Sequence, residues 1–152
     1  MMVPNPTQTW PLFTYGTLMS GQVAFHRLAA AVVRLAPARL PGAVLHDLGR
    51  YPMAALAEGD ASEAPVVHGE LHWLAPESHA YTLALLDAYE GDGYTRARLP
   101  VILAETGERV EAWVYLGKPE IAARFSVVPG GDWRVYVEQV DHSVSISMEE
   151  FR

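Results

Sequence analysis

Short β-type runs dominate this chain, and its helical stretches are too few for a parallel α/β fold. Glycine and proline recur at short intervals, as expected where turns join many short strands. A doubly wound parallel sheet needs a crossover helix between successive strands, and only two clear helical stretches are present. We therefore predict an α+β fold with two main helices and a mixed, mostly antiparallel, barrel-like sheet. The predicted strands span residues 10–15, 39–47, 53–57, 66–74, 98–105 and 109–116.

Two stretches carry the apolar periodicity of helices. In residues 22–35, apolar side chains recur three or four positions apart, and Pro37 then stops the helix. In residues 76–90, proline occupies the first turn, where it is tolerated, and Gly91 supplies a C-terminal stop. We predict a helix in each stretch. The turn 105–108 contains a glycine and would join the last two strands as a hairpin.

Length and composition indicate one folded domain, residues 1–152, and we expect flexible tails at residues 1–9 and 142–152. A chain of 152 residues can bury enough surface for a single core without disulfides. Half of its residues are hydrophobic and 19% are charged, whereas disordered chains have few hydrophobic and many charged residues, so we expect the chain to fold. Cysteine is absent, which excludes disulfides and a cysteine nucleophile and leads us to expect a cytoplasmic protein.

The same composition limits the partners that the chain is expected to bind. The formal net charge is 11 − 18 = −7, which argues against binding to nucleic acid. The N-terminal residues lack the basic and apolar regions of a signal peptide, and the longest apolar run is too short to span a membrane. We expect no membrane partner, and the sequence makes no prediction of oligomeric state.

The first candidate for a binding site is the loop that follows Phe13 and Thr14. The β-type run breaks at Gly16, and a helical stretch follows within a few residues. Backbone N–H groups in such a loop have no ladder partners and lie near a positive helix end, so they can hold a carboxylate. A glycine at such a position also commonly serves only to turn the chain, and the residue types leave both interpretations open.

The second candidate is Glu90, which follows Leu83 by seven residues and Leu86 by four. This spacing places Glu90 on the apolar stripe of its helix, where burial and the negative helix end both favour the protonated carboxyl group. A carboxyl group of this kind suits proton transfer at neutral pH. The alternatives are that Glu90 ends the helix in solvent or pairs with Arg96 or Arg98.

The third candidate is the run His68-Gly69-Glu70-Leu71-His72. Alternation along a strand places His68, Glu70 and His72 on one face, where they could bind zinc or iron. Successive residues on one face of a strand are about 7 Å apart, however, so three of them reach one ion with difficulty. A polar face or hydrogen-bonded core positions are favoured over a metal site, and we predict neither a metal nor a cofactor.

Taken in order, several motifs resemble the gamma-glutamyl cyclotransferase-like family. The resemblance covers most of the chain, from about Leu12 to Trp133. Its strongest elements are YGTL near the N-terminus and LDxYEGxxYxR in the middle of the chain. YGTL, rather than YGSL, is closer to the gamma-glutamylamine branch than to the glutathione-specific branch. The matching segments are FTYGTLM (13–19), YPMA (51–54), VVHGEL (66–71), LDAYEGDGYTR (86–96), AWVYLG (112–117) and GGDW (130–133).

The resemblance implies a compact mixed β-barrel flanked by helices, with a pocket between the YGTL loop and the helix that carries the acid. Known members of the family convert gamma-glutamyl compounds into 5-oxoproline and a freed amine or peptide. The resemblance makes Glu90 the catalytic acid/base. It assigns backbone N–H groups of the loop to the lining of the site and three aromatic residues to pocket walls or support. The substrate-binding residues are then Tyr15, Gly16, Thr17, Leu18, Tyr94, Tyr115 and Trp133.

This reaction fits the available residues, because the α-amino group of the substrate itself attacks the γ-carbonyl carbon. The enzyme needs no serine, cysteine, metal or cofactor, and its partner is a small gamma-glutamyl molecule. The main alternative is a non-catalytic module of the same fold that holds a small carboxylate or meets a protein partner. A further alternative is a metal-dependent hydrolase with His68 and His72 as ligands.

Overall fold

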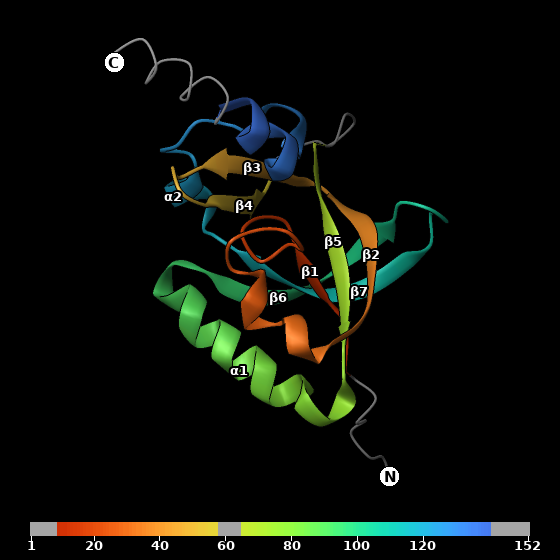
Figure 1. Cartoon of the computed structure of the whole chain (residues 1–152). Helices are drawn as coiled ribbons and strands as arrows, with labels where there is room; N and C mark the ends of the chain where they lie inside the picture. Colours follow the sequence, from red (N-terminus) through yellow and green to blue (C-terminus); the bar gives the residue numbers. More distant parts are fainter. Residues whose placement is uncertain (1–8, 58–64, 141–152) are drawn as a thin grey trace, which may run out of the picture.

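The computed structural model describes residues 9–57 and 65–140, and its main feature is a closed barrel of five strands. The strands follow the order β1-β5-β2-β6-β7, and pairing of β1 with β7 closes the barrel (Figure 1). Among the described strands only this closing pair is parallel, which confirms the predicted mixed, mostly antiparallel sheet. The barrel strands are β1 (Leu12–Thr14), β2 (Val32–Pro41), β5 (Val66–Leu74), β6 (Thr95–Leu103) and β7 (Arg109–Leu116).

The remaining elements lie around the barrel. The long helix α1 (His79–Glu90) crosses one side of it, and a separate hairpin of β3 (Ala43–Asp47) and β4 (Pro52–Leu56) lies on the opposite side (Figure 1). Residues 133–140 are also helical. The short elements are α2 (Pro119–Ala122) and the 3₁₀ turns η1 (Phe25–Arg27), η2 (Ala29–Ala31), η3 (Pro76–Ser78), η4 (Gly91–Gly93) and η5 (Pro129–Gly131).

The predicted helix 22–35 is wrong. The chain forms the two 3₁₀ turns η1 and η2 there, and β2 begins at Val32. Apolar residues three positions apart also fit 3₁₀ turns, which have three residues per turn. The β-branched Val32 and Val33 favour a strand, and Val32 pairs with Leu74 of β5. The second predicted helix is confirmed, with η3 as its first turn and α1 as its body.

Glycines with positive φ decide two of the chain reversals. The predicted strand 39–47 is two strands, because Gly42 has φ +83° and turns the chain between β2 and β3. Gly107 has φ +75° in the turn between β6 and β7, which confirms the predicted hairpin. The predicted strands 66–74 and 109–116 are confirmed with the same bounds.

Side-chain alternation along β1 divides the core into two clusters. Phe13 packs inside the barrel, with Leu71 and Val114. The neighbouring Leu12 belongs instead to the cluster that contains Leu83 and Leu86 of α1. The C-terminal end of β1 therefore lies between the barrel interior and the helix that carries Glu90.

Two sequence expectations concern the ends of the chain and membranes. The predicted tails, residues 1–9 and 142–152, fall outside the described residues except for Thr9. Among the described helices, none has the length and apolar character needed to cross a membrane.

Candidate functional site

A cavity of about 230 Å³ lies where the end of β1, the loop after it, the turn before β4 and the end of α1 meet. This volume is below the roughly 300–1,000 Å³ of pockets that hold drug-sized ligands, so the cavity suits a small molecule. The cavity brings together six of the seven residues predicted to bind substrate, together with Glu90. Its lining residues are Phe13, Thr14, Tyr15, Gly16, Thr17, Leu18, Tyr51, Pro52, Tyr89, Glu90, Tyr94 and Tyr115.

All four residues of the loop 15–18 line this cavity. Pairing of β1 with β5 ends at Thr14, so the loop that follows has no ladder partner. The loop is held through its carbonyl groups, because Gly16 O accepts from Met19 N at 3.0 Å and Thr17 O accepts from Ala24 N at 2.9 Å. Within residues 9–57 and 65–140, the N–H groups of Gly16, Thr17 and Leu18 donate to no other group. They can therefore donate to an anion.

Gly16 is needed because the first residue of β4, Pro52, approaches the loop closely. A Cβ atom at position 16 would lie 2.6 Å from Cγ of Pro52, closer than real Cβ atoms come to a neighbour. Pro52 and the adjacent Tyr51 both line the cavity, and they belong to the YPMA motif of the sequence. Glycine at this position therefore lets two separate segments form one wall.

Glu90 is the last residue of α1 and is partly buried. Burial raises the pKa of its carboxyl group from 4.5 to about 7. Neither arginine proposed as its partner pairs with it: Arg96 binds Asp87 at 2.8 Å, and Arg98 lies 3.5 Å from Glu111. In the described part of the chain Glu90 has no ion pair and no side-chain hydrogen bond, so its carboxyl group is available to a ligand.

Three tyrosines of the cavity use their hydroxyl groups inside the protein. Tyr15 Oη donates to the carbonyl oxygen of Tyr115 at 2.6 Å, and Tyr94 Oη donates to that of Pro52 at 2.8 Å. Tyr115 Oη donates to Oδ1 of Asp87 at 2.7 Å. Burial is the first cause that raises the pKa of all three hydroxyl groups, so they stay protonated. Their rings therefore form a fixed wall.

Trp133 does not line this cavity, unlike the other predicted substrate-binding residues. It is 3% exposed, belongs to the barrel core and packs against Tyr136 with ring centres 5.6 Å apart. The preceding Gly131 explains this position, because a Cβ there would collide with the carbonyl oxygen of Val66 in β5. This close approach carries Trp133 into the core, where it supports the barrel rather than the cavity wall.

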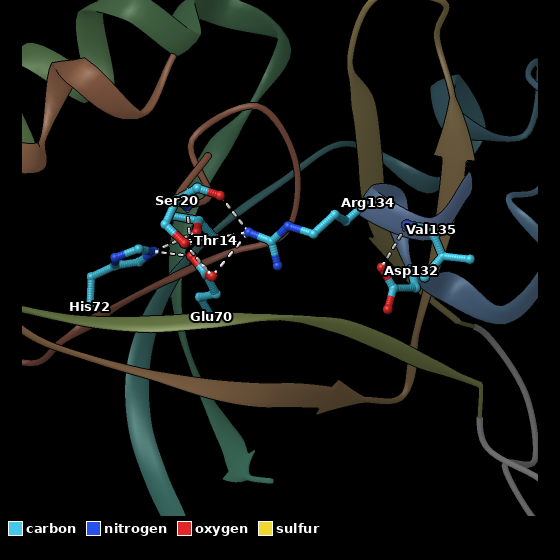
Figure 2. A network of polar contacts seen from close by, with 7 residues as sticks. All are labelled: Thr14, Ser20, Glu70, His72, Asp132, Arg134 and Val135. Atoms are coloured by element: carbon cyan, nitrogen blue, oxygen red, sulfur yellow. Dashed lines mark hydrogen bonds and ion pairs between the residues drawn. The ribbon is translucent and has the colours of Figure 1, made fainter. Parts of the chain in front are cut away.

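The run from His68 to His72 does not assemble a metal site. In β5, Glu70 accepts hydrogen bonds from the backbone N and Oγ of Ser20, both at 2.7 Å, and from Nη2 of Arg134 at 3.0 Å (Figure 2). The ranges 9–57 and 65–140 contain no group of three histidine, aspartate or glutamate side chains placed to hold an ion. The alternation correctly pairs Glu70 with His72 on one face, but the pair joins a polar network.

Sequence reasoning missed five residues of the cavity wall. Tyr51 and Pro52 stand in a motif that the resemblance used only as a match, and Tyr89 directly precedes Glu90. Phe13 and Thr14 lie in the same run as the predicted loop residues and could have been included with them.

Comparison with known families gives a match over most of the chain. The family model described as "Gamma-glutamyl cyclotransferase, AIG2-like" matches residues 12–135. A comparison with curated proteins finds no match to this sequence.

Solved structures include several with a similar fold. YkqA from Bacillus subtilis is 22% identical with a TM-score of 0.68, and the match covers 88% of this chain but 42% of YkqA. An AIG2-like protein from Mus musculus is 22% identical with a TM-score of 0.57, over 78% of this chain and 84% of that one. A yeast gamma-glutamyl cyclotransferase specific to glutathione is 16% identical with a TM-score of 0.56, over 90% and 86%. At these identities the likeness describes the fold alone.

Proposed function

This chain belongs to the gamma-glutamyl cyclotransferase, AIG2-like family, and on that premise we propose that it releases 5-oxoproline and a free amine or peptide from a gamma-glutamyl compound. One observation carries the proposal: Glu90, which has no ion-pair partner among the described residues, lines the same cavity as the loop 15–18. An acid with a raised pKa and a set of free N–H groups are the two parts that this ring closure requires.

The substrate's charged end is held by the backbone rather than by a basic side chain. No lysine or arginine stands among the cavity residues within the described ranges. The N–H groups of Gly16, Thr17 and Leu18 are therefore the proposed donors to a carboxylate or to the oxyanion that develops on the γ-carbonyl oxygen.

Glu90 then moves the protons of the reaction. The substrate's α-amino nitrogen attacks the γ-carbonyl carbon, and the carboxylate of Glu90 takes a proton from that nitrogen. The same proton passes to the departing nitrogen as its bond to the carbon breaks, so Glu90 returns to its starting state. A pKa of about 7 keeps both forms of the group populated at neutral pH, and such general acid/base catalysis contributes roughly 10²- to 10⁴-fold.

The fixed aromatic walls contribute by holding the substrate in a folded shape. Ring closure requires the amine and the carbonyl carbon to meet, and a correctly oriented intramolecular reaction can gain roughly 7–11 kcal/mol over a bimolecular one. Tyr15, Tyr94 and Tyr115 are suited to this role because their hydroxyl groups are bound inside the protein. They are the proposed pocket walls.

Gamma-glutamyl amines are the first substrates to test, because the loop reads YGTL rather than YGSL. The absence of cysteine supports a cytoplasmic setting for this small-molecule reaction, and the net charge of −7 supports a role without nucleic acid.

The experiment incubates the whole chain with gamma-glutamyl amines, gamma-glutamyl dipeptides and glutathione, and measures 5-oxoproline. We expect release from at least one of them, and we expect Glu90→Gln to slow it by about 10²- to 10⁴-fold without changing the circular dichroism spectrum. Glu77→Gln is the matched control, because Glu77 is an exposed residue next to the other end of α1. Ligand binding without release from any substrate would support the non-catalytic module instead.

A further inference from the structure

Thr14 belongs both to the cavity wall and to the polar network that surrounds Glu70 (Figure 2). It is the last residue of β1, and its Oγ1 lies 2.7 Å from Nε2 of His72. In the register of β1 with β5, Thr14 faces Glu70 and Leu12 faces His72, so the three polar side chains share one face of the sheet. The hydrogen bond between His72 and Thr14 therefore affects the orientation of a hydroxyl group that belongs to a residue of the cavity wall.

The charge of Glu70 determines which ring nitrogen of His72 carries the hydrogen. Burial alone would raise the pKa of Glu70, but hydrogen bonds from Ser20 and Arg134 outweigh burial and lower it, so the side chain is a carboxylate. Its Oε1 lies 3.5 Å from Nε2 of His72. A carboxylate repels a bare ring nitrogen and attracts an N–H group, so a hydrogen on Nε2 is favoured.

The surroundings of Nδ1, the other ring nitrogen of His72, also favour a hydrogen on Nε2. His72 is fully buried, and its Nδ1 has no hydrogen-bond partner in the described structure. A hydrogen on Nδ1 would leave a buried donor unmet, and such orphaned donors are rarer than unmet acceptors. Burial also lowers the pKa of His72, which favours the neutral ring. The neutral ring therefore carries its single hydrogen on Nε2.

This tautomer fixes the direction of the hydroxyl group of Thr14. The Nε2–H group of His72 donates to Oγ1, so the oxygen acts as an acceptor in that contact. The hydroxyl hydrogen must then point elsewhere, and among the described residues Oγ1 has no second partner. Because Thr14 lines the cavity, the hydrogen has an acceptor available when a ligand is bound there.

We infer that the hydroxyl group of Thr14 donates to the carboxylate of the bound gamma-glutamyl group, with His72 and Glu70 as positioning residues that keep the hydroxyl turned toward the cavity. The inference rests on the proposed function, since it names a contact to that substrate. It adds a side-chain donor beside the N–H groups of the neighbouring loop. The product 5-oxoproline keeps the same carboxylate, so it is a probe that needs no turnover.

The test compares binding of 5-oxoproline to the wild-type chain, Thr14→Val and Thr14→Ser by calorimetric titration. A hydrogen bond to a charged group corresponds to about 10- to 100-fold in affinity, so Thr14→Val should weaken binding by that factor. Thr14→Ser keeps the hydroxyl and should bind within about threefold of the wild type. Thr82→Val is the matched control, because Thr82 is a buried threonine of α1 that does not line the cavity.

Nitrogen NMR of labelled histidine supplies a readout that loss of packing would not imitate. We expect His72 to show a protonated Nε2 and a bare Nδ1 in the free protein. A protonated Nδ1 with a bare Nε2 overturns the inference. Equal affinity of the wild type and Thr14→Val for 5-oxoproline also overturns it, provided that the wild type binds 5-oxoproline and turns over substrate. Binding that depends on the Thr14 hydroxyl without any turnover supports this contact and overturns the proposed catalysis. Failure of the wild type to bind 5-oxoproline overturns the inference alone, because the proposed function is tested separately by release of 5-oxoproline from substrate.

Discussion

Glu70 and Glu90 are two glutamates in different surroundings: Glu70 binds Ser20 at the end of the loop 15–20, and Glu90 lines the cavity with residues 15–18. Glu70 is buried and Glu90 is partly buried, and burial acts on both to raise the pKa. Glu70 receives three hydrogen bonds from Ser20 and Arg134, and its pKa falls below the ordinary value. Glu90 has no such donor in the described chain, and its pKa rises to about 7.

The difference shows that hydrogen-bond donors, more than burial, decide whether the pKa of such a carboxyl group falls or rises. The donors around Glu70 keep it a carboxylate at neutral pH, and it ties the end of the loop to β5 through Ser20. The lack of donors at Glu90 leaves it able to gain and lose a proton at neutral pH. Glu70 thus holds the end of the loop through Ser20, and Glu90 lines the same cavity as the loop.

The largest expected effect is the loss of turnover when Glu90 is changed. Glu90→Gln should lower kcat by about 10²- to 10⁴-fold, because the amide cannot accept the proton of the attacking amine. Its melting temperature should not fall, since the change removes no hydrogen bond or ion pair in the described structure. Steady-state kinetics and thermal unfolding check the two halves, and a variant with full activity would remove Glu90 from the mechanism.

The second effect should appear in stability, when Glu70 is changed. Glu70→Ala leaves the backbone N and hydroxyl of Ser20 without their acceptor, which we expect to cost about 2–4 kcal/mol of unfolding free energy. Urea denaturation measures this cost. Glu138→Ala, at an exposed position, is the control and should stay within about 0.5 kcal/mol of the wild type. Equal stability of the two variants would mean that Glu70 does not hold the loop.

The two acids should give opposite dependences of stability on pH. Between pH 4.5 and about 7 the folded chain keeps the proton of Glu90 that the unfolded chain has released, so stability falls as pH rises across this window. The pKa of Glu70 is lowered by folding, so its contribution is present above 4.5 and is lost as pH falls.

Urea denaturation of the wild type, Glu90→Gln and Glu70→Gln across pH 3 to 8 separates these contributions. The decline between pH 4.5 and 7 should disappear only in Glu90→Gln. The value of kcat/KM should rise with pH through about 7 in the wild type, because the base form of Glu90 is the active one. A decline in stability that persists in Glu90→Gln would assign it to another group.

The smallest effect is expected at Arg134. Its ion pair with Glu70 is 3.0 Å long, but the arginine side chain is 41% exposed, and exposed ion pairs contribute about 1 kcal/mol or less. Arg134→Ala should therefore destabilise the chain by about 1 kcal/mol in urea, less than Glu70→Ala. A larger loss for Arg134→Ala than for Glu70→Ala would reverse the proposed order of the two contributions to the network.

Local sequence patterns correctly predicted the elements in which the apolar periodicity and the flanking stop residues indicate the same structure. The strands 66–74 and 109–116 and the helix that ends at Glu90 combine periodicity with proline or glycine stops. The helix predicted for residues 22–35 failed because its apolar spacing also fits 3₁₀ turns, and pairing of Val32 with Leu74 in β5 decided between them.

The sequence by itself indicated a strand-rich, mostly antiparallel fold, a place for Glu90 on the apolar stripe of its helix and a loop without ladder partners after Thr14, because each follows from residues a few positions apart. The tertiary structure alone decided which groups meet. It paired Arg96 with Asp87, so that Glu90 has no ion pair within residues 9–57 and 65–140, and it placed Trp133 in the core. It also joined Glu70 to Ser20, 50 residues away. Such partners lie far apart in the chain, and only barrel closure brings them within hydrogen-bonding distance.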